Sequence, residues 1–401
     1  MKIFEINSVN YGSTGKLVSS IADLAEEKGH EVYRTSGFTK RKIKGKRWFI
    51  TSHAPAKLFH TYMARLTGLN GCFSVLPTIS LIARLRRIKP DLIHCHNLHG
   101  WFLNLPLFFK YIKKAQIPIV WTLHDCWAFT GQCPHFTVAN CDKWKTGCHD
   151  CPFPHDEYPQ ACVDRSELMW RIKKKWFTGV KNMTIVTPSQ WLADLVNQSY
   201  LGEYPVQVIN NGIDLSVFTP TSSNFRDRYG IGDKYIVLGV SLGWGDKKGL
   251  DVFVELSKRL PESYQIVLVG TNGDTDSVLP DNIISIHSTN NQQELAEIYT
   301  ASDVFANPTR EENYPTVNME ALACGTPVVT FNTGGSPEII DESCGIVVDC
   351  NDIDAMECAI KNVCENKLFS EAACLKHAED FDSNVRFQEY IDLYHHVLGE
   401  E

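Results

Sequence analysis

Short apolar runs alternate with amphipathic stretches along almost the whole chain. Residues 3–9 predict a strand, residues 12–15 a turn, and the apolar positions between residues 17 and 25 one face of a helix that ends at Gly29. This order is the opening of a βαβ unit, so we expect an α/β fold with parallel sheets. Further strands are predicted at residues 91–95, 117–123, 183–187, 235–240, 265–269, 283–286, 304–306 and 328–331, with helices between them such as residues 293–300.

The length of the chain predicts two domains. A chain of 401 residues exceeds what one hydrophobic core usually serves, and 43% hydrophobic residues are enough for two cores. The plan of the first half recurs after residues 209–214, where we expect the hinge. The predicted domains are therefore residues 1–210 and 211–383. Apolar positions between residues 385 and 398 predict a last helix within residues 384–401.

Two carboxylates, Glu312 and Glu320, stand eight residues apart between two predicted strands. Pro315 suits a first helical position, so amides near residues 313–317 can face an anion such as phosphate, with the helix dipole behind them. Carboxylates accept hydrogen bonds from sugar hydroxyls. A lone pair at this spacing is usually a solvated loop charge and a helix residue. Its place after the strand that ends near Pro308 favours a ligand site instead.

The segment from Glu312 to Pro327 resembles the signature of the family-4 retaining glycosyltransferases of GT-B fold. That signature is Glu-x7-Glu, followed by Glu-Ala-x-Ala-Cys-Gly-Thr-Pro-Val, and the resemblance extends over nearly the whole chain. Residues 122–131 and 142–148 resemble the bacterial branch that builds colanic-acid-type and capsular polysaccharides. The resemblance implies two Rossmann-like parallel-sheet domains that face each other across a cleft. It also implies that the last helix crosses back to the first domain.

The resemblance further implies a division of labour between the domains. Residues 1–210 with the last helix would bind the acceptor, residues 211–383 would bind the nucleotide sugar, and residues 126–162 form a Cys-rich insertion. The donor-binding residues that we expect are Gly12, Gly15, Lys247, Lys248, Asn313, Tyr314, Pro315, Thr316, Val317 and Glu320.

Two of these donor contacts have simpler alternatives. Glycines at 12 and 15 let backbone amides approach a diphosphate, although the same sequence also suits an ordinary βα turn. It does not form a Walker A loop, because Leu17 follows Lys16 where that motif needs Ser or Thr. In the family, a Lys-Gly pair and an upstream Arg neutralise the donor phosphates. That Arg is absent here, so Lys247 would supply the second charge beside Lys248, unless both are merely solvated.

His124 and Glu312 are the candidate catalytic residues. A lone His at a strand end is often structural, but the resemblance places His124 near the donor sugar, where we expect it to position the sugar and not to act as a base. Family members of this kind react on one face of the sugar, and the departing phosphate oxygen accepts the proton from the acceptor. Catalysis then rests on stabilising the leaving diphosphate, with no protein nucleophile and no catalytic metal ion.

Residues 94–99 contain three histidines that resemble a metal cluster. We expect His94 and His96, two positions apart on a strand, to face opposite sides, which would prevent shared coordination. We therefore prefer an acceptor pocket, which comprises His96, Asn97, His99 and Asp125.

Four cysteines in the insertion have spacing that suits a structural zinc ion. Cys148 and Cys151 form a Cys-x-x-Cys pair, and Cys133 and Cys141 could complete a tetrahedral shell. The loop that holds them is too long and polar to be ordered by itself, and a metal would supply that order. Reduced thiols are the alternative, and the substitute ligands are His135, His149 and Cys162.

Charge is distributed unevenly between the two halves. Residues 1–200 contain 27 Lys and Arg against 14 Asp and Glu, whereas the rest contain 12 against 33. A basic half suits an anionic surface or a lipid phosphate. Basic and aromatic residues interleave at 40–48 and 170–177, as in interfacial membrane segments, although solvated faces explain them equally well.

Taken together with these patterns, the resemblance implies a retaining hexosyltransferase of surface polysaccharide biosynthesis, such as capsule or exopolysaccharide. We expect a UDP- or GDP-type nucleotide sugar as donor, a lipid-linked or oligosaccharide acceptor, and no nucleic acid. No long apolar segment occurs, so we expect a cytoplasmic protein with reduced cysteines, in peripheral contact with the anionic inner face of the plasma membrane. The alternatives are an epimerase-like enzyme of the same architecture and an inactive regulator that binds sugar nucleotides.

Overall fold

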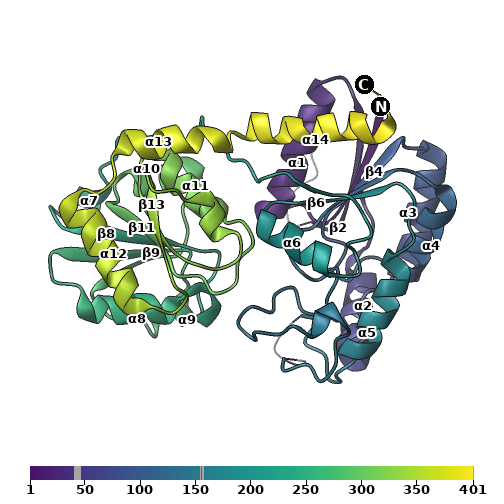
Figure 1. Ribbon diagram of the computed structural model, residues 1–401, viewed down its shortest axis with the longest axis horizontal. Coiled ribbons are helices and arrows are strands. Elements are labelled where there is room, and N and C mark those ends of the chain that lie inside the picture. The colour runs from purple at the N-terminus through teal and green to yellow at the C-terminus, as the bar shows by residue number, and fades with distance from the viewer. Residues whose placement is uncertain (40–46, 154, 156–157, 401) are drawn as a thin grey trace. The chain divides into compact units, whose positions relative to one another are not determined.

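The computed structural model describes residues 1–39, 47–153, 155 and 158–400 (Figure 1). It divides into two compact units. Unit 1 comprises residues 1–210 and 387–401, and unit 2 comprises residues 211–386. Most of the basic segment expected at 40–48 lies outside the described residues. No helix in the described ranges is both long and apolar enough to cross a membrane.

Unit 1 is built on a seven-stranded parallel sheet with the order β3-β2-β1-β4-β5-β6-β7. Its strands are β1 Lys2–Val9, β2 Glu31–Phe38, β3 Trp48–Ile50, β4 Leu92–Cys95, β5 Ile119–Thr122, β6 Met183–Thr187 and β7 Val206–Val208. Its helices are α1 Gly12–Glu27, α2 Ala54–Thr67, α3 Val75–Ile88, α4 Leu105–Ala115, η1 Lys143–Lys145, α5 Ser166–Phe177, α6 Gln190–Gln198 and α14 Ser383–Leu398.

Both faces of this sheet are buried, because neighbouring residues on each strand belong to different hydrophobic clusters. On β1, Phe4 packs with helices α3, α4 and α5, whereas Ile3 packs with α1 and α14. On β5, Trp121 belongs to the same cluster as Phe4, and Val120 belongs to the same cluster as Ile3. Since parallel strands with two covered faces leave only their ends open, polar chemistry is confined to the edges of the sheet.

Unit 2 repeats the architecture with a six-stranded parallel sheet of order β10-β9-β8-β11-β12-β13. Its strands are β8 Tyr235–Val240, β9 Tyr264–Val269, β10 Ile283–Ile286, β11 Val304–Asn307, β12 Val328–Phe331 and β13 Gly345–Val348. Its helices are α7 Phe225–Arg228, η2 Asp246–Lys248, α8 Leu250–Arg259, α9 Gly273–Asp276, α10 Gln292–Thr300, α11 Thr316–Ala323, η3 Ser336–Ile339, α12 Ile353–Asn366, α13 Glu371–Ala378 and η4 Glu379–Phe381. Helices α8 and α12 pack on one face, and α10, α11 and α13 on the other.

The strands predicted from the sequence are all present, with ends shifted by at most two residues. Strands β2, β3, β7 and β13 were not predicted. Strand β2 was missed because polar residues interrupt it. It holds Arg34, whose guanidinium is buried and pairs with Asp23 at 2.6 Å and with Glu26 at 3.0 Å. The predicted turn at residues 12–15 is wrong, because α1 already begins at Gly12.

The final helix, α14, belongs to unit 1 from Phe387 onward. Its Tyr394 is fully buried against the sheet, and its hydroxyl lies 2.6 Å from His94 Nδ1 and donates to Glu5 Oε1 at 3.3 Å. The neighbouring Tyr390 is buried too, but its hydroxyl accepts only a 3.5 Å hydrogen bond from Thr122. One hydroxyl therefore connects the end of the chain to the charged residues of β1 and β4.

We predict that Tyr394→Phe lowers the free energy of unfolding of unit 1 by about 1–3 kcal/mol, because it leaves buried polar atoms without a partner. Urea unfolding followed by tryptophan fluorescence measures this, since eight of the nine tryptophans lie in unit 1. Tyr390→Phe is the matched control and should cost less than about 1 kcal/mol, because its hydrogen bond is long. Equal losses in the two variants would contradict the anchoring role of Tyr394.

Candidate functional site

The strand order of unit 2 places a topological switch point between β8 and β11. These neighbours are followed by loops that lead to opposite sides of the sheet, to α8 after β8 and to α11 after β11. In open α/β sheets, ligands bind beside the carboxyl ends of the strands at such a point. The predicted donor residues Lys247 and Lys248 follow β8, and those from Glu312 onward follow β11.

Two lysine-glutamate pairs connect these loops. Lys248 Nζ donates to Glu312 Oε2 at 2.6 Å, and Lys247 Nζ lies 2.7 Å from Glu311 Oε2. Glu311 is buried, whereas the side chains of Glu312 and Lys248 are 26% and 37% exposed. The Lys248–Glu312 pair is therefore open to a ligand. The lysines are not merely solvated, and neither pairing was foreseen from the sequence.

Glycines allow these loops to approach each other closely. Gly249 has a φ of +73°, and a Cβ there would lie 2.4 Å from the carbonyl oxygen of Pro308. Gly334 has a φ of +60°, and a Cβ there would lie 1.9 Å from the carbonyl oxygen of Glu312. Only glycine fits at either place. The Lys-Gly sequence at 248–249 thus has a structural cause, since it brings the lysine beside the loop that follows β11.

Helix α11 begins one residue later than predicted. Pro315 is the N-cap residue, with an extended ψ of 116°, and Thr316 is the first helical residue. No described side chain caps this helix. The first amides of a helix lack partners within the helix, so those of Thr316 and Val317, both half-buried, open toward the end of the sheet. The other two predicted donor residues, Asn313 and Tyr314, are buried.

Glu320 lies one turn into α11, and its Oε2 accepts a hydrogen bond from the hydroxyl of Tyr299 at 3.2 Å. Below the helix start, Asn318 is completely buried, and its amide group accepts from Asn307 at 2.8 Å and donates to Ser336 at 3.0 Å. This network fixes the start of α11 on β11. The sequence signalled it only weakly, through the Asn-Pro pair at the end of the strand.

In unit 1 the corresponding switch point lies between β1 and β4. Helix α1 follows β1, and its N-cap residue Tyr11 makes no side-chain cap. Gly12 has a φ of +71°, and a Cβ on Gly15 would lie 2.6 Å from the backbone of Asn10. Both predicted glycines therefore lie in the first turn of a helix and not in a loop, and they keep its start open.

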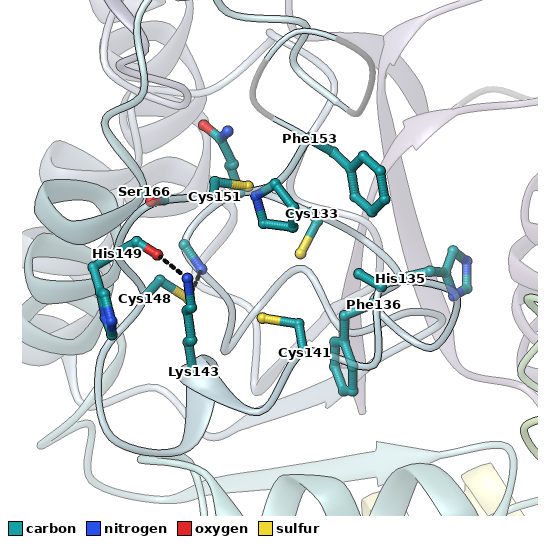
Figure 2. Close-up of a pocket in the computed structure, with 14 residues that line it drawn as sticks. Cys133, His135, Phe136, Cys141, Lys143, Cys148, His149, Cys151, Phe153 and Ser166 are labelled. Carbon is teal, nitrogen blue, oxygen red and sulfur yellow. Dashed lines mark hydrogen bonds between the residues drawn. The ribbon is translucent and has the colours of Figure 1, made fainter.

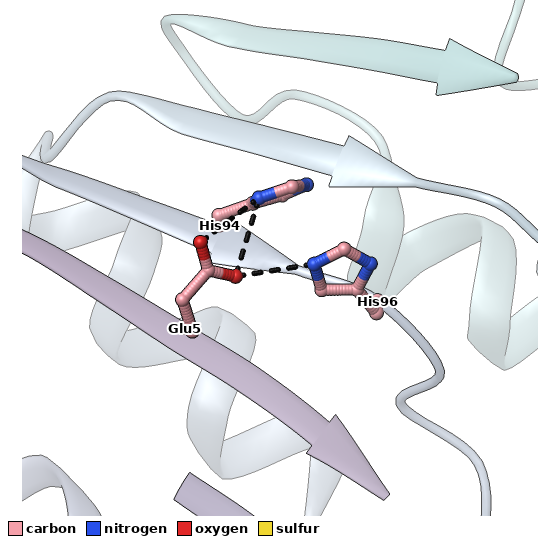
Figure 3. Close-up of side chains that lie close together, drawn as sticks. All are labelled: Glu5, His94 and His96. Atoms are coloured by element: carbon pink, nitrogen blue, oxygen red, sulfur yellow. Dashed lines mark hydrogen bonds and ion pairs between the residues drawn. The ribbon is translucent and has the colours of Figure 1, made fainter. Parts of the chain in front are cut away.

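Our expectation that His94 and His96 face opposite sides is wrong, because side chains two positions apart on a strand share a face. Figure 3 shows both imidazoles pointing at the carboxylate of Glu5 on the neighbouring strand β1. His94 Nδ1 donates to Oε1 at 3.3 Å, and His96 Nε2 donates to Oε2 at 3.1 Å. These atoms form a close group of metal-ligand type, but His94 Nε2 also contacts Thr122 at 2.8 Å. The group is a buried hydrogen-bond network.

The other candidate residues of unit 1 extend this network. His124 Nε2 lies 3.2 Å from His96 Nδ1, and the amide of Asn97 donates to the side chain of Asn7 at 3.2 Å. His99 Nε2 lies 2.9 Å from Asp125 Oδ2. The predicted acceptor residues thus gather at the carboxyl ends of β1, β4 and β5.

Burial determines the protonation of this network. It lowers the pKa of His124 to about 3, helped by the nearby charge of His96, and that of His96 to about 4, helped by His94. Burial opposes ionisation of Glu5, but the charge and hydrogen bond of His94 outweigh it and lower the pKa of Glu5 to about 2. Asp125 behaves similarly, since His99 outweighs burial and lowers its pKa to about 2. At neutral pH, His96 and His124 are neutral and both carboxylates are ionised.

The Cys-rich segment lies between β5 and α5, and Figure 2 shows its four predicted metal ligands around one pocket. The segment has more of its own hydrophobic packing than expected. Trp144 is 1% exposed, and its ring centroid lies 5.1 Å from that of Phe129 and 5.1 Å from that of Phe136. Of the substitute ligands, His135 and His149 border the pocket, and Cys162 is exposed and does not line it.

The aromatic residues of the basic segment 170–177 do not form an exposed face. Trp170 and Phe177 on α5 are buried in the core of unit 1, and Lys173 between them is 0% exposed. The sequence pattern at 170–177 is therefore that of a core helix, and its resemblance to an interfacial membrane segment is not supported by these positions.

Comparison with known families agrees with the fold described above. The family model described as Glycosyltransferase Family 4 matches residues 15–217, about half of the chain, and that described as Glycosyl transferases group 1 matches residues 234–366. The chain belongs to the family-4 glycosyltransferases. The segments carrying Lys248, Glu312 and Glu320 fall within the second match.

Curated relatives of this family 4 chain are moderately similar. It is 28% identical over 272 residues to the colanic acid biosynthesis glycosyl transferase WcaC of Escherichia coli (strain K12), covering 66% of this chain and 65% of that protein. It is 32% identical over 171 residues to a GDP-mannose-dependent alpha-(1-6)-phosphatidylinositol monomannoside mannosyltransferase of Mycolicibacterium smegmatis, covering 37% and 44%. The chain thus spans less than two thirds of either relative.

Solved structures share the fold over the whole chain. Sucrose-phosphate synthase from Thermosynechococcus elongatus has a TM-score of 0.71 and 17% identity, with full coverage of both chains. Anabaena HepE in complex with UDP-glucose has a TM-score of 0.68 and 14% identity, and WaaG, involved in lipopolysaccharide biosynthesis, has 0.68 and 16%. Coverage is 98% of this chain and 99% of theirs. The expected GT-B fold with two Rossmann-like parallel-sheet parts is confirmed.

We predict that unit 1 becomes less stable as the pH falls from about 6.5 toward 4. Because the folded pKa values of His96 and His124 lie below the unfolded value near 6.5, the unfolded chain binds more protons in this window. Each histidine then contributes up to about 1.4 kcal/mol per pH unit. Urea unfolding between these pH values measures the slope.

The variant His124→Gln should reduce this slope. His287→Gln is the matched control, because His287 is an exposed residue of unit 2. A slope in the His124 variant equal to that of the wild type would show that His124 is not kept neutral by folding.

Proposed function

We propose that this protein is a retaining glycosyltransferase that transfers a hexose from a UDP- or GDP-type nucleotide sugar to a lipid-linked saccharide in bacterial surface-polysaccharide assembly. The observation that carries the proposal is the Lys248–Glu312 ion pair beside the uncapped start of α11, at the switch point of unit 2. This combination offers positive charge, free amides and carboxylates within one short stretch of structure, as a sugar diphosphate requires.

The phosphates of the donor would lie at the start of α11. The amides of Thr316 and Val317 supply hydrogen bonds there, and Lys248 supplies charge. The family's upstream Arg is absent, and Arg310 does not take its place, because its guanidinium bonds both carboxylate oxygens of Asp251 at 2.7 Å. Charge on the leaving diphosphate would thus be stabilised by lysines and helix amides.

The two carboxylates would hold the two sugars of the donor. Glu320 Oε2 accepts a hydrogen bond from Tyr299, and an ionised carboxylate can accept several hydrogen bonds, so Glu320 can also accept from ribose hydroxyls. Glu312 can accept from hydroxyls of the transferred hexose while it keeps Lys248 in place. In unit 1, His124 is neutral at physiological pH, because burial lowers its pKa to about 3, and this suits hydrogen bonding to a sugar better than proton transfer.

The names of similar proteins support this donor class without identifying the nucleotide base. HepE is solved with UDP and with UDP-glucose, whereas the Mycolicibacterium relative depends on GDP-mannose. WcaC is named for colanic acid biosynthesis. These names motivate a nucleotide-sugar donor and a surface-polysaccharide product. A thermal-shift screen with UDP-, GDP-, ADP- and dTDP-sugars would identify the nucleotide, because selective binding raises the melting temperature.

We predict that Glu320→Ala weakens binding of the nucleotide identified in this screen by about tenfold to a hundredfold, because hydrogen bonds to a charged group are lost. Isothermal titration calorimetry measures the dissociation constant. Tyr299→Phe is the matched control, since it removes the same internal hydrogen bond but leaves the carboxylate, and its affinity should stay within about twofold of the wild type.

Equal affinity of Glu320→Ala and wild type would refute the ribose assignment. The reaction itself is tested by incubating the protein with the identified donor and a lipid-pyrophosphate-linked saccharide. An NMR spectrum of the product should show the anomeric configuration of the donor. An inverted product would refute the retaining mechanism, and binding with neither transfer nor hydrolysis would favour a regulator.

A further inference from the structure

Four cysteine side chains converge from one loop onto a single pocket in unit 1. Figure 2 shows the sulfur atoms of Cys133, Cys141, Cys148 and Cys151 directed toward its interior. All four are free thiols. We propose that these four residues bind one structural Zn²⁺ ion as a tetrahedral tetrathiolate site, separate from the donor and acceptor residues described above.

The chemistry of the pocket favours sulfur ligands alone. In Figure 2 the imidazole rings of His135 and His149 point away from the four sulfurs, and His149 Nδ1 lies 2.9 Å from the carbonyl oxygen of Gly147. Cys162 is exposed and does not line the pocket. Four thiolates in tetrahedral array select zinc among the common cellular cations, as soft ligands do.

The backbone already provides the hydrogen bonds that thiolate ligands need. The amide of Gly131 donates to Cys148 Sγ at 3.1 Å. A Cβ on Gly131 would lie 2.6 Å from the carbonyl oxygen of Ser166, so only glycine brings this amide so close to the sulfur. A backbone hydrogen bond from Phe153 reaches Cys151 in the same way. Such bonds orient metal ligands and disperse their charge.

A buried lysine lies near two of the four cysteines, Cys148 and Cys133. The ammonium of Lys173 is 0% exposed and donates to the carbonyl oxygens of Trp127 and Thr130. Among the described residues, no carboxylate forms an ion pair with it. Zn²⁺ with four thiolates carries a net charge of −2, and one positive charge on Lys173 would offset half of it.

Metal binding would draw the loop inward. No three of the four sulfurs lie within 4.8 Å of one another, as the atoms of the Glu5 cluster do, whereas a shell with Zn–S bonds of about 2.3 Å places all four roughly 3.8 Å apart. The same loop begins directly after His124 and Asp125 and leads into α5. An ion that fixes the loop therefore also fixes the residues that precede it, without taking part in sugar transfer.

The full-length protein, expressed with zinc in the medium, tests this proposal by elemental analysis. We expect one zinc per chain in the wild type and in the control Cys350→Ser, because Cys350 is exposed in unit 2. Cys148→Ser should lose most of the zinc and melt at a lower temperature. Cys162→Ser, a control within the same loop, should keep the zinc.

A second measurement needs no variant and so does not depend on the folding of Cys148→Ser. The wild-type protein, freed of zinc and given Co²⁺, should show the sulfur-to-cobalt charge-transfer bands of a tetrahedral thiolate site. The proposal would be overturned by folded protein that contains no zinc, gives no such bands and lets the thiols of Cys133, Cys141, Cys148 and Cys151 react freely. Iron in place of zinc would overturn the metal assignment, and zinc retained by Cys148→Ser would overturn the ligand set.

Discussion

Glu5 is an ionised carboxylate that is 1% exposed in the middle of the first strand, and much of unit 1 is arranged around it. A buried charge is tolerated only when its lone pairs accept hydrogen bonds, and here the end of one neighbouring strand and the final helix supply the donors. His94 and His96 reach it from β4, and Tyr394 reaches it from α14. The chain must therefore return to unit 1 after unit 2 is complete. The last helix thus completes the hydrogen-bond network around Glu5.

Unit 2 uses a different balance of charge and burial. Its inner polar network at Asn307, Asn318 and Ser336 is neutral and fully satisfied, and it holds the start of α11 on the sheet. The charged pair of Lys248 and Glu312 lies outside this network and stays partly exposed. The buried network thus fixes the backbone, and the partly exposed pair supplies charged groups next to it. This arrangement suits a charged ligand, because the protein needs little reorganisation when the ligand binds.

The sequence predicted the unit 2 segment well because its information is local. Strand, proline, helix and two carboxylates follow one another within about twenty residues, so their order nearly determines their geometry. The position of Pro315 was wrong by one residue, which is the usual uncertainty of helix ends. The Lys248–Glu312 pair could not be predicted from local sequence, because its partners lie 64 residues apart. They come together only because β8 and β11 are neighbours in the sheet.

Unit 1 was harder for the same physical reason and for one error of reasoning. The period of two along a strand should have placed His94 and His96 together, and the acidic Glu5 in an otherwise apolar strand was the signal for their partner. Strand β2 was missed because the charge of Arg34 is neutralised by residues of α1, which no strand pattern contains.

Lys173 shows the opposite error, since the basic and aromatic segment 170–177 resembled an interfacial membrane segment although one of its three lysines and two of its aromatic residues are buried. These cases suggest how burial separates structural from functional polar groups in this chain. Glu5, Asn318 and Arg34 are buried and find their partners within their own unit. They need no ligand as a partner, and their substitution would lower the free energy of unfolding. Glu320 and Glu312 are carboxylates at partly exposed positions, so an incoming hydroxyl can reach them and donate a hydrogen bond.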